Sequence, residues 1–327
     1  MDLRHVGALS HEILTEVERA VVGKREALRL VLSGVLAGGH VLMEDFPGLG
    51  KTLAARSFAQ TLGLEFRRAQ FTPDLLPGDI TGSFMFDQKA GEFEFRPGPL
   101  FAGLLLADEI NRTPPKTQAA LLEAMQEQQV TVEGRTFRLP QPFHVLATAN
   151  PVEYEGTYPL PEAQLDRFLM RVSFGYPSLD EEWQILANRM ERRQEAQTLR
   201  QVVSGEQLLE MQRAVETTVV DESVGRYCVA LAAASRTHGE VLMGASPRGS
   251  LGLLLSARAY AVVDGRDYVT PEDVKAVAVP VLAHRITVKP ELWMSHITGT
   301  HVVNGLLRNV PTPSPREPRP PSGLARS

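Results

Sequence analysis

The stretch EDFPGLGKT, residues 44–52, decides the fold expected for this chain. A short apolar run at 41–43 precedes it and a helix-favouring run at 53–62 follows it, which is the strand, loop and helix context of a phosphate-binding loop. The glycines of the loop let the backbone curl, so that several N–H groups and the N-terminal end of the next helix point at an anion. The strict pattern G-x-x-x-x-G-K-[ST] has glycine where this chain has Asp45. Taken alone, the loop therefore leaves a plain glycine turn as the alternative.

Each position of the loop has a chemical part to play if it holds a nucleotide. Lys51 would neutralise the β- and γ-phosphates, and the hydroxyl of Thr52 would bind Mg²⁺. The loop therefore predicts ATP and Mg²⁺ as cofactors. The loop residues expected at the nucleotide are Asp45, Pro47, Gly48, Leu49, Gly50, Lys51, Thr52 and Leu53.

A second segment, LLLADE at 104–109, supports the same site. It is a four-residue apolar run that ends in two adjacent carboxylates, which are costly to bury unless a cation or a polar ligand meets them. Asp108 would hold the metal through water, and Glu109 would orient and polarise the attacking water. The alternative is a buried strand that runs into a solvated turn. Together the two segments predict a site that binds and hydrolyses ATP.

Composition limits the classes of protein to which the chain can belong. Its 327 residues, 43% of them apolar, predict about two globular domains. A net charge of -5 gives no overall basic field, so we expect nucleic acid to be an unlikely partner. Cys228 is the single cysteine, which excludes an intrachain disulfide and fits a reducing compartment. No secretory signal or run of about 20 apolar residues is recognisable, so we expect a cytoplasmic protein with no membrane span.

The order of patterns along the chain predicts two domains of different class. Strand-like runs at 41–43, 65–70, 104–108, 144–149 and 169–174 alternate with helix-like stretches such as 116–129. This alternation predicts an α/β domain, residues 1–178, with a parallel five-stranded sheet between helices.

Beyond residue 178 strands largely disappear and helix-start signals dominate. Ser178 and Ser204 each begin a capping box, and Thr270 is an N-cap followed by proline and two acids. We therefore expect a smaller helical lid domain at 179–308. Residues 309–327, rich in proline and arginine, are expected to be disordered, with proline-motif docking as an alternative.

Two insertions in the α/β domain show alternation around a turn. Residues 84–95 carry aromatic residues at every second position on both sides of a polar turn, and residues 130–138 alternate around a glycine. Both patterns predict β-hairpins. The aromatic hairpin either packs on its own domain or grips a partner, and the sequence leaves both readings open.

Five segments of this chain resemble the MoxR family of AAA+ ATPases, and the resemblance runs from about residue 21 to residue 308. The resemblance implies a P-loop AAA+ core followed by a helical lid, and an acid at position 45 is a usual variation in this family. The segments that carry the resemblance are 44–52, 70–82, 104–112, 159–168 and 244–248.

The resemblance implies roles for residues outside the two motifs. Val22 and Gly23 would line the adenine pocket, although without the family they would be an ordinary turn before a helix. Asn150 would act as a sensor that holds the attacking water or the γ-phosphate, since an amide both donates and accepts. The alternative for Asn150 is a turn cap before Pro151.

The resemblance also implies two arginines that act on the nucleotide. Arg167 would be the arginine finger inserted into the neighbouring subunit, and Arg112 and Arg171 are rival candidates. A surface pair with Asp166 is the alternative for Arg167. Arg248 would be the second sensor, contacting the γ-phosphate of its own subunit, and its alternative is a solvent-facing arginine at a helix N-terminus.

The family further implies partners and a task. We expect a homo-oligomer, a hexameric ring, in which the two hairpins face the ring centre or a protein client. A partner with a von Willebrand factor A domain would come from another polypeptide, and the task would be remodelling of protein complexes or insertion of metal cofactors. The alternatives are a nucleic-acid-associated motor and a nucleotide-gated scaffold with little turnover.

Overall fold

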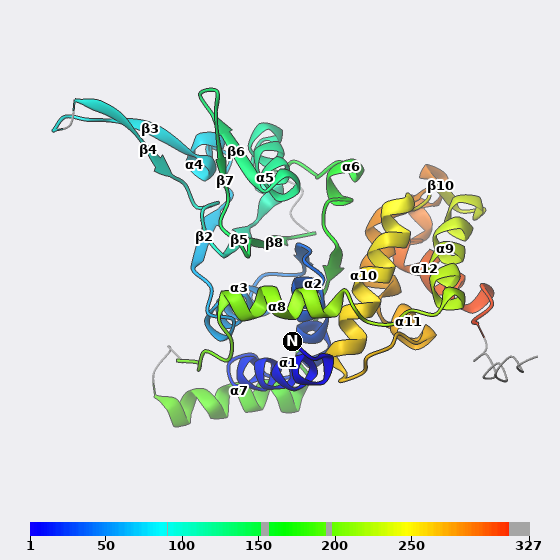
Figure 1. The fold of residues 1–327 in the computed structure, drawn as a ribbon. Coiled ribbons are helices and arrows are strands. Elements are labelled where there is room, and N and C mark those ends of the chain that lie inside the picture. The colour runs from blue at the N-terminus through cyan, green and yellow to red at the C-terminus, as the bar shows by residue number, and fades with distance from the viewer. Residues whose placement is uncertain (90, 152–156, 194–197, 314–327) are drawn as a thin grey trace, which may run out of the picture.

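The computed structural model describes residues 1–89, 91–151, 157–193 and 198–313. A five-stranded sheet lies at its centre, with the strand order β2-β5-β8-β1-β9 and every neighbouring pair parallel (Figure 1). This confirms the predicted parallel sheet. The strands are β1 (Val41–Glu44), β2 (Phe66–Gln70), β5 (Leu104–Asp108), β8 (His144–Ala149) and β9 (Met170–Val172).

Helices cover both faces of the sheet because its strands are apolar on both sides. Leu104 and Leu106 of β5 pack in one hydrophobic cluster with α1, α2 and α3, whereas Leu105 and Ala107 pack in a second cluster with α4 and α5. Alternate side chains of a strand point to opposite faces, so a continuous apolar run is buried twice. These helices are α1 (Leu3–Glu18), α2 (Arg25–Leu36), α3 (Lys51–Thr61), α4 (Pro77–Thr81) and α5 (Pro115–Glu127).

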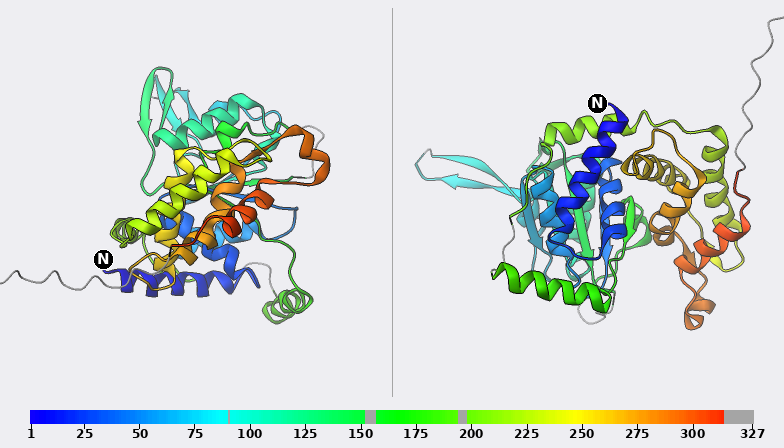
Figure 2. Two further views of the ribbon diagram at one scale, coloured as in Figure 1. Left: turned by 90° about the vertical axis from the view of Figure 1, so that its right-hand side faces the viewer. Right: turned by 90° about the horizontal axis from the view of Figure 1, so that it is seen from below.

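Both predicted hairpins are present. The first consists of β3 (Gly82–Asp87) and β4 (Glu92–Pro97), and the second of β6 (Gln129–Val132) and β7 (Arg135–Arg138). At the base of the first hairpin, Phe95 stacks on Phe137 of the second with ring centroids 4.0 Å apart. The tip of the first hairpin projects away from the rest of the molecule, as Figures 1 and 2 show. The hairpin is therefore packed on its own domain at the base and unpartnered at the tip.

The part of the chain after the sheet is mostly helical, as expected, and the three helix-start signals form caps in the structure. A short antiparallel pair, β10 (Val241–Met243) with β11 (Thr287–Val288), adds strands that the sequence did not indicate. The longer helices are α7 (Leu179–Arg192), α8 (Gly205–Val215), α9 (Glu222–Thr237), α10 (Pro247–Val263), α11 (Pro271–Leu282) and α12 (Gly299–Asn309). The shorter ones are α6 (Glu162–Leu165) and the 3-10 turns η1 (Ile110–Arg112), η2 (Ala283–Arg285) and η3 (Pro290–Ser295).

The helices of the second part do not all pack together. Helices α9 to α12 contact one another, whereas α8 packs on α1 and α2, and Gln212 of α8 donates to the backbone oxygen of Val35 at 2.8 Å. The domain boundary at residue 178 therefore stays a prediction. The expected tail at 309–327 lies mostly outside the described residues, which end at residue 313.

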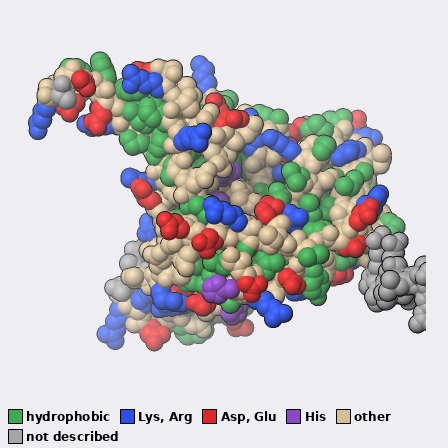
Figure 3. All heavy atoms as spheres, in the orientation of Figure 1, with side chains coloured by type: hydrophobic (Ala, Val, Ile, Leu, Met, Phe, Trp, Pro, Cys, Tyr) green, Lys and Arg blue, Asp and Glu red, His purple; other side chains and the backbone are tan. Residues whose placement is uncertain are grey.

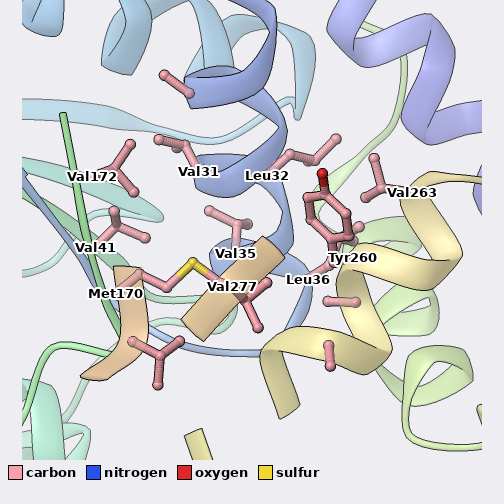
Figure 4. Close-up of a cluster of buried hydrophobic side chains, with 14 of the residues drawn as sticks. Val31, Leu32, Val35, Leu36, Val41, Met170, Val172, Tyr260, Val263 and Val277 are labelled. Atoms are coloured by element: carbon pink, nitrogen blue, oxygen red, sulfur yellow. The ribbon is translucent and has the colours of Figure 1, made fainter. Parts of the chain in front are cut away.

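A shared hydrophobic cluster joins the sheet to the lid helices (Figure 4). Helix α2 lies in the middle of it: Val31 and Val35 lie near Val41 and Met170 of the sheet, while Leu32 lies near Tyr260 of α10. Arg29 of α2 also places its guanidinium over the Tyr260 ring, 4.5 Å from the ring centroid. The lid is therefore fixed to the core through α2.

Among the described residues, no helix combines the length and the apolar composition that crossing a bilayer requires.

A buried histidine at the start of β1 predicts a pH-dependent stability. The backbone N–H of Val145 donates to Nδ1 of His40, and Nε2 of His40 lies 3.1 Å from the backbone oxygen of Met125. The neutral ring with its proton on Nε2 satisfies both contacts. Burial, helped by the nearby His144, lowers the pKa of His40 to about 3.

Because this pKa is lower in the folded chain than in the unfolded chain, the unfolded chain binds more protons below about pH 6.5. His40 should therefore reduce the free energy of unfolding by about 1.4 kcal/mol for each pH unit below 6.5. His40→Asn keeps an acceptor for Val145 without a titrating ring. Urea unfolding at pH 7 and pH 5 should show the wild type losing about 2 kcal/mol more than this variant. Equal losses would mean that His40 is not the titrating group.

Candidate nucleotide site

The phosphate-binding loop lies between β1 and α3, at the carboxyl end of the sheet. Gly48 and Gly50 have φ angles of 81° and 84°, a backbone conformation that other residues rarely adopt. Gly50 is the N-cap of α3, and no side chain caps that helix. The first N–H groups of α3 are thus left for an anion, as a phosphate site requires.

Lys51 lies inside this loop. Its Nζ donates to the backbone oxygens of Asp45 and Phe46, the latter at 3.2 Å. Partial burial lowers the pKa of Lys51 from its ordinary value, and the carboxylates of Asp45 and of its neighbours Asp108, Glu109 and Glu44 oppose this shift. The ammonium thus lies among carboxylates and backbone carbonyl oxygens. A bound phosphate would replace these carbonyl oxygens as the hydrogen-bond partner of Lys51.

Asp45, the departure from the strict loop pattern, has a structural contact of its own. Its Oδ2 accepts hydrogen bonds from the hydroxyl of Ser173 at 3.0 Å and from the backbone N–H groups of Phe174 and Gly175. The carboxylate therefore ties the loop to the segment after β9. Its side chain makes these contacts in place of facing the phosphate loop's cavity.

The two carboxylates of the second motif follow β5 and meet the neighbouring strands. Thr148 of β8 donates to Asp108 Oδ1 at 2.5 Å and accepts the backbone N–H of Glu109 at 2.8 Å. Arg68 of β2 contacts Asp108 Oδ2 at 2.7 Å. Thr148 thus ties both acids to β8, while Arg68 neutralises the first.

Glu109 has its own partners within the chain. Its Oε2 accepts from Gln70 Nε2 at 2.7 Å and from Arg112 Nη1 at 3.0 Å. No role was expected for Gln70, Arg68 or Thr148 individually. A signal for Gln70 and Thr148 was present, since both lie at or near the carboxyl ends of strands that flank the acidic strand.

One cavity of about 340 Å³ unites most of the expected residues. Its donor set fits a magnesium nucleotide, because backbone N–H groups suit phosphates and the Thr52 hydroxyl and Asp108 carboxylate are the hard oxygen ligands that Mg²⁺ prefers. Bound Mg²⁺ would polarise the phosphoryl oxygens. The residues that line the cavity are Pro47, Gly48, Leu49, Gly50, Lys51, Thr52, Leu53, Asp108, Glu109, Thr148, Ala149 and Asn150.

Val22 and Gly23 are not among the lining residues. Gly23 has a φ of 72°, and a Cβ at this position would lie 2.2 Å from Cδ of Glu181, in the first turn of α7. The backbone of this segment is thus close to the start of α7. The role of Val22 and Gly23 at the adenine stays a prediction.

Arg167 and Arg248 are together, but they lie away from the phosphate loop. Both line a second cavity, of about 260 Å³, with Gly39 and His40, which precede β1. Arg248 Nη1 lies 3.8 Å from Asp166, the neighbour of Arg167. This cavity is at the amino ends of β1 and β9, whereas the phosphate loop follows the carboxyl end of β1, about 13 Å further along the strand.

The role of Arg248 as the second sensor stays a prediction, and in this structure Arg248 lies away from the phosphate loop of its own chain. The reason is the packing of the lid: α10 contacts α2 and α11, and α11 contacts β9. These contacts bring the N-terminus of α10 to the amino end of the sheet.

The two other candidates for the arginine finger form ion pairs within the chain. Arg112 pairs with Glu109, and Arg171 pairs with Glu44 at 2.9 Å. In the described part of the chain, the guanidinium of Arg167 has no hydrogen-bond or ion-pair partner. This difference favours Arg167, among the three candidates, as the arginine finger for a neighbouring subunit.

Comparison with known proteins agrees with this geometry. Residues 40–170 match the model of the ATPase family associated with various cellular activities (AAA), and residues 233–304 match an AAA lid domain. A crystal structure of a protein assigned as an ATPase from Cytophaga hutchinsonii superposes with a TM-score of 0.88 and 40% identity, covering 95% of this chain and 96% of that one. The fold and the ATPase class are thus shared over nearly the whole chain.

Two curated relatives narrow the family. Chaperone MoxR1 of Mycobacterium tuberculosis is 44% identical over 307 residues, which are 91% of this chain and 81% of the relative. Protein MoxR of Methylorubrum extorquens is 31% identical over 323 residues, which are 91% and 93% of the two chains. With the phosphate loop, the paired carboxylates and the helical lid in place, the chain belongs to the MoxR family of AAA+ ATPases.

Proposed function

We propose that this chain hydrolyses Mg-ATP as a subunit of a homo-oligomeric ring and uses the hydrolysis to remodel protein complexes as a chaperone. The observation that carries this proposal is the separation of the two halves of the site. The phosphate loop is at the carboxyl end of the sheet, and Arg167 with Arg248 is at the amino end. Neither half reaches the other within one chain, so a complete site needs a second copy.

Such a contact joins two different surfaces, since the arginine side of one copy faces the loop side of the next. A contact between unlike surfaces that closes on itself generates a ring, and we propose six subunits from the resemblance to the family. An arginine supplied in this way stabilises the charge of the transferring phosphoryl group. Asn150, which lines the loop cavity, would hold the attacking water beside Glu109.

Exposed apolar side chains on α7 support assembly. This helix buries no residue, and its exposed apolar side chains recur at helical spacing. Contiguous apolar patches of this kind are typical of interaction surfaces. The residues of this face are Leu179, Trp183, Leu186 and Met190.

The projecting hairpin supports a protein client. Phe86 and Phe93 pair near its tip with ring centroids 5.3 Å apart and are 54% and 69% exposed. Figure 3 shows hydrophobic side chains on this projecting arm. The relative named as a chaperone supports the same class of task. The family resemblance supports a von Willebrand factor A domain partner in trans, and metal-cofactor insertion as one form of the task.

The test is to complement two inactive variants. Lys51→Ala removes the loop's cation and Arg167→Ala removes the finger, so each alone should have little ATPase activity. Mixed at equal concentrations, about one interface in four would join an intact loop to an intact finger. We expect the mixture to recover measurable ATPase activity, and the wild-type rate per subunit to rise with protein concentration. Two inactive parents with no recovery in the mixture would refute the shared site.

A further inference from the structure

Arg285 of the lid is a buried arginine that belongs to none of the sequence motifs described above. It ends η2, only 8% of the residue is exposed, and its side chain lies under α10. Cβ atoms at Gly249 and Gly252 of α10 would lie 3.5 Å from its Cδ and 4.0 Å from its Cζ. The Arg285 side chain therefore runs close beside this face of α10.

The guanidinium of Arg285 holds the segment that carries Arg167. Its Nε donates to Asp166 Oδ1 at 2.7 Å, and its Nη2 donates to the backbone oxygens of Asp166 at 3.2 Å and Phe168 at 2.8 Å. Nη1 donates to the backbone oxygen of Leu169 at 3.2 Å. Arg285 therefore binds the residues on both sides of Arg167 and leaves the Arg167 guanidinium itself unengaged.

Asp166 connects this contact to the second arginine. The same carboxylate that accepts from Arg285 also faces Arg248 Nη1 at 3.8 Å. Arg248 lies in the first turn of α10, and α10 packs on α11, which leads directly into η2. One buried guanidinium thus fixes the backbone beside Arg167 and the carboxylate beside Arg248.

We propose that Arg285 is a positioning residue that holds Arg167 and Arg248 side by side, so that both reach the nucleotide of the adjacent subunit together. Arg285 does not contact the nucleotide. Arg248 belongs to the lid and Arg167 to the segment that leads into β9 of the sheet, so the seating of the lid on the core in one subunit would control hydrolysis in the next. This inference rests on the proposed function, because it assumes that the arginines act across an interface.

The geometry requires arginine at position 285. A planar guanidinium directs several N–H groups to separate acceptors at once, whereas the ammonium of lysine is a single point of charge. Arg285→Lys keeps a positive charge beside Asp166 and is expected to fold. It should loosen the 166–169 segment.

The experiment introduces Arg285→Lys either into the subunit that donates the arginines or into the subunit that holds the nucleotide. In the mixture of Lys51→Ala with Arg167→Ala, the first subunit donates the arginines and the second holds the nucleotide. Adding Arg285→Lys to the Lys51→Ala subunit should lower kcat of the mixture at least about tenfold, with KM for ATP within about twofold. Adding it to the Arg167→Ala subunit should change kcat less than about twofold.

The outcomes separate the two proposals. Equal losses from both placements, or no loss from either, would overturn the positioning role, because a residue needed only for folding acts wherever it is placed. No recovery in the parent mixture would instead overturn the proposed function itself. If Arg285→Lys fails to fold, the double variant Arg285→Met with Asp166→Asn removes the buried charge of Arg285 together with that of its half-buried partner. It should show the same asymmetry, and a symmetric loss would count against the proposal in the same way.

Discussion

Glu109→Gln is expected to keep ATP bound and to slow its hydrolysis at least about 100-fold, the scale of a lost general base. The amide has the shape of the carboxylate, and its oxygen still accepts from Gln70 and Arg112 as Glu109 does. The local structure should therefore survive. The variant lacks only the negative charge that polarises the attacking water. Equilibrium binding of a fluorescent ATP analogue and single-turnover hydrolysis measure the two effects separately.

A matched control is available on α5. Glu123→Gln makes the same chemical change on an exposed face of that helix and should leave both measurements unchanged. If Glu109→Gln hydrolyses ATP at the wild-type rate, another group positions the water. Weakened binding with an unchanged single-turnover rate would give Glu109 a part in holding ATP rather than in the chemistry.

The parts of the site that could be predicted from sequence are those built from adjacent residues. The phosphate loop needs only residues 44–52 in the order strand, loop and helix, and the two acids need only the end of one buried strand. Local chain geometry fixes these relations whatever the rest of the fold does. The sheet could be predicted as well, because its apolar runs alternate with helical patterns.

The parts that could not be predicted depend on contacts between distant residues. Arg285 meets Asp166 across 119 positions of sequence, and Glu109 meets Gln70 across 39. A single sequence can place Gln70 at the end of a strand, but it does not show which strands are neighbours, and it carries no signal for the pair of Arg285 with Asp166. The position of Arg248 relative to the phosphate loop is of the same kind, since it depends on which end of the sheet the lid covers. Asp45 shows a third case, in which a departure from a motif is explained by a contact 128 to 130 positions later.

Lys51→Ala should weaken ATP binding at least about 100-fold. Charge-assisted hydrogen bonds to the β- and γ-phosphates contribute about 1.5–3 kcal/mol each, so about 3 kcal/mol or more together, and a tenfold change in affinity corresponds to about 1.4 kcal/mol. Lys51 is the loop's own cation, and its Nζ already lies in the loop beside the backbone oxygens of Asp45 and Phe46. The side chain of Lys51 is partly exposed, so water can solvate these oxygens in the variant. The fold should therefore stay intact. Titration with the fluorescent ATP analogue in the presence of Mg²⁺ measures the loss.

Thermal unfolding distinguishes lost binding from lost structure. ATP at 100 times its Kd would stabilise the wild type by about 2.7 kcal/mol, because it binds only the folded chain. Lys51→Ala should unfold at nearly the wild-type temperature without nucleotide and should gain almost nothing when ATP is added. Lys116→Ala, an exposed lysine on α5, should retain the full gain. A normal gain in Lys51→Ala would contradict the role of Lys51 at the phosphates, because the helix N-terminus and the loop glycines alone would then account for the affinity.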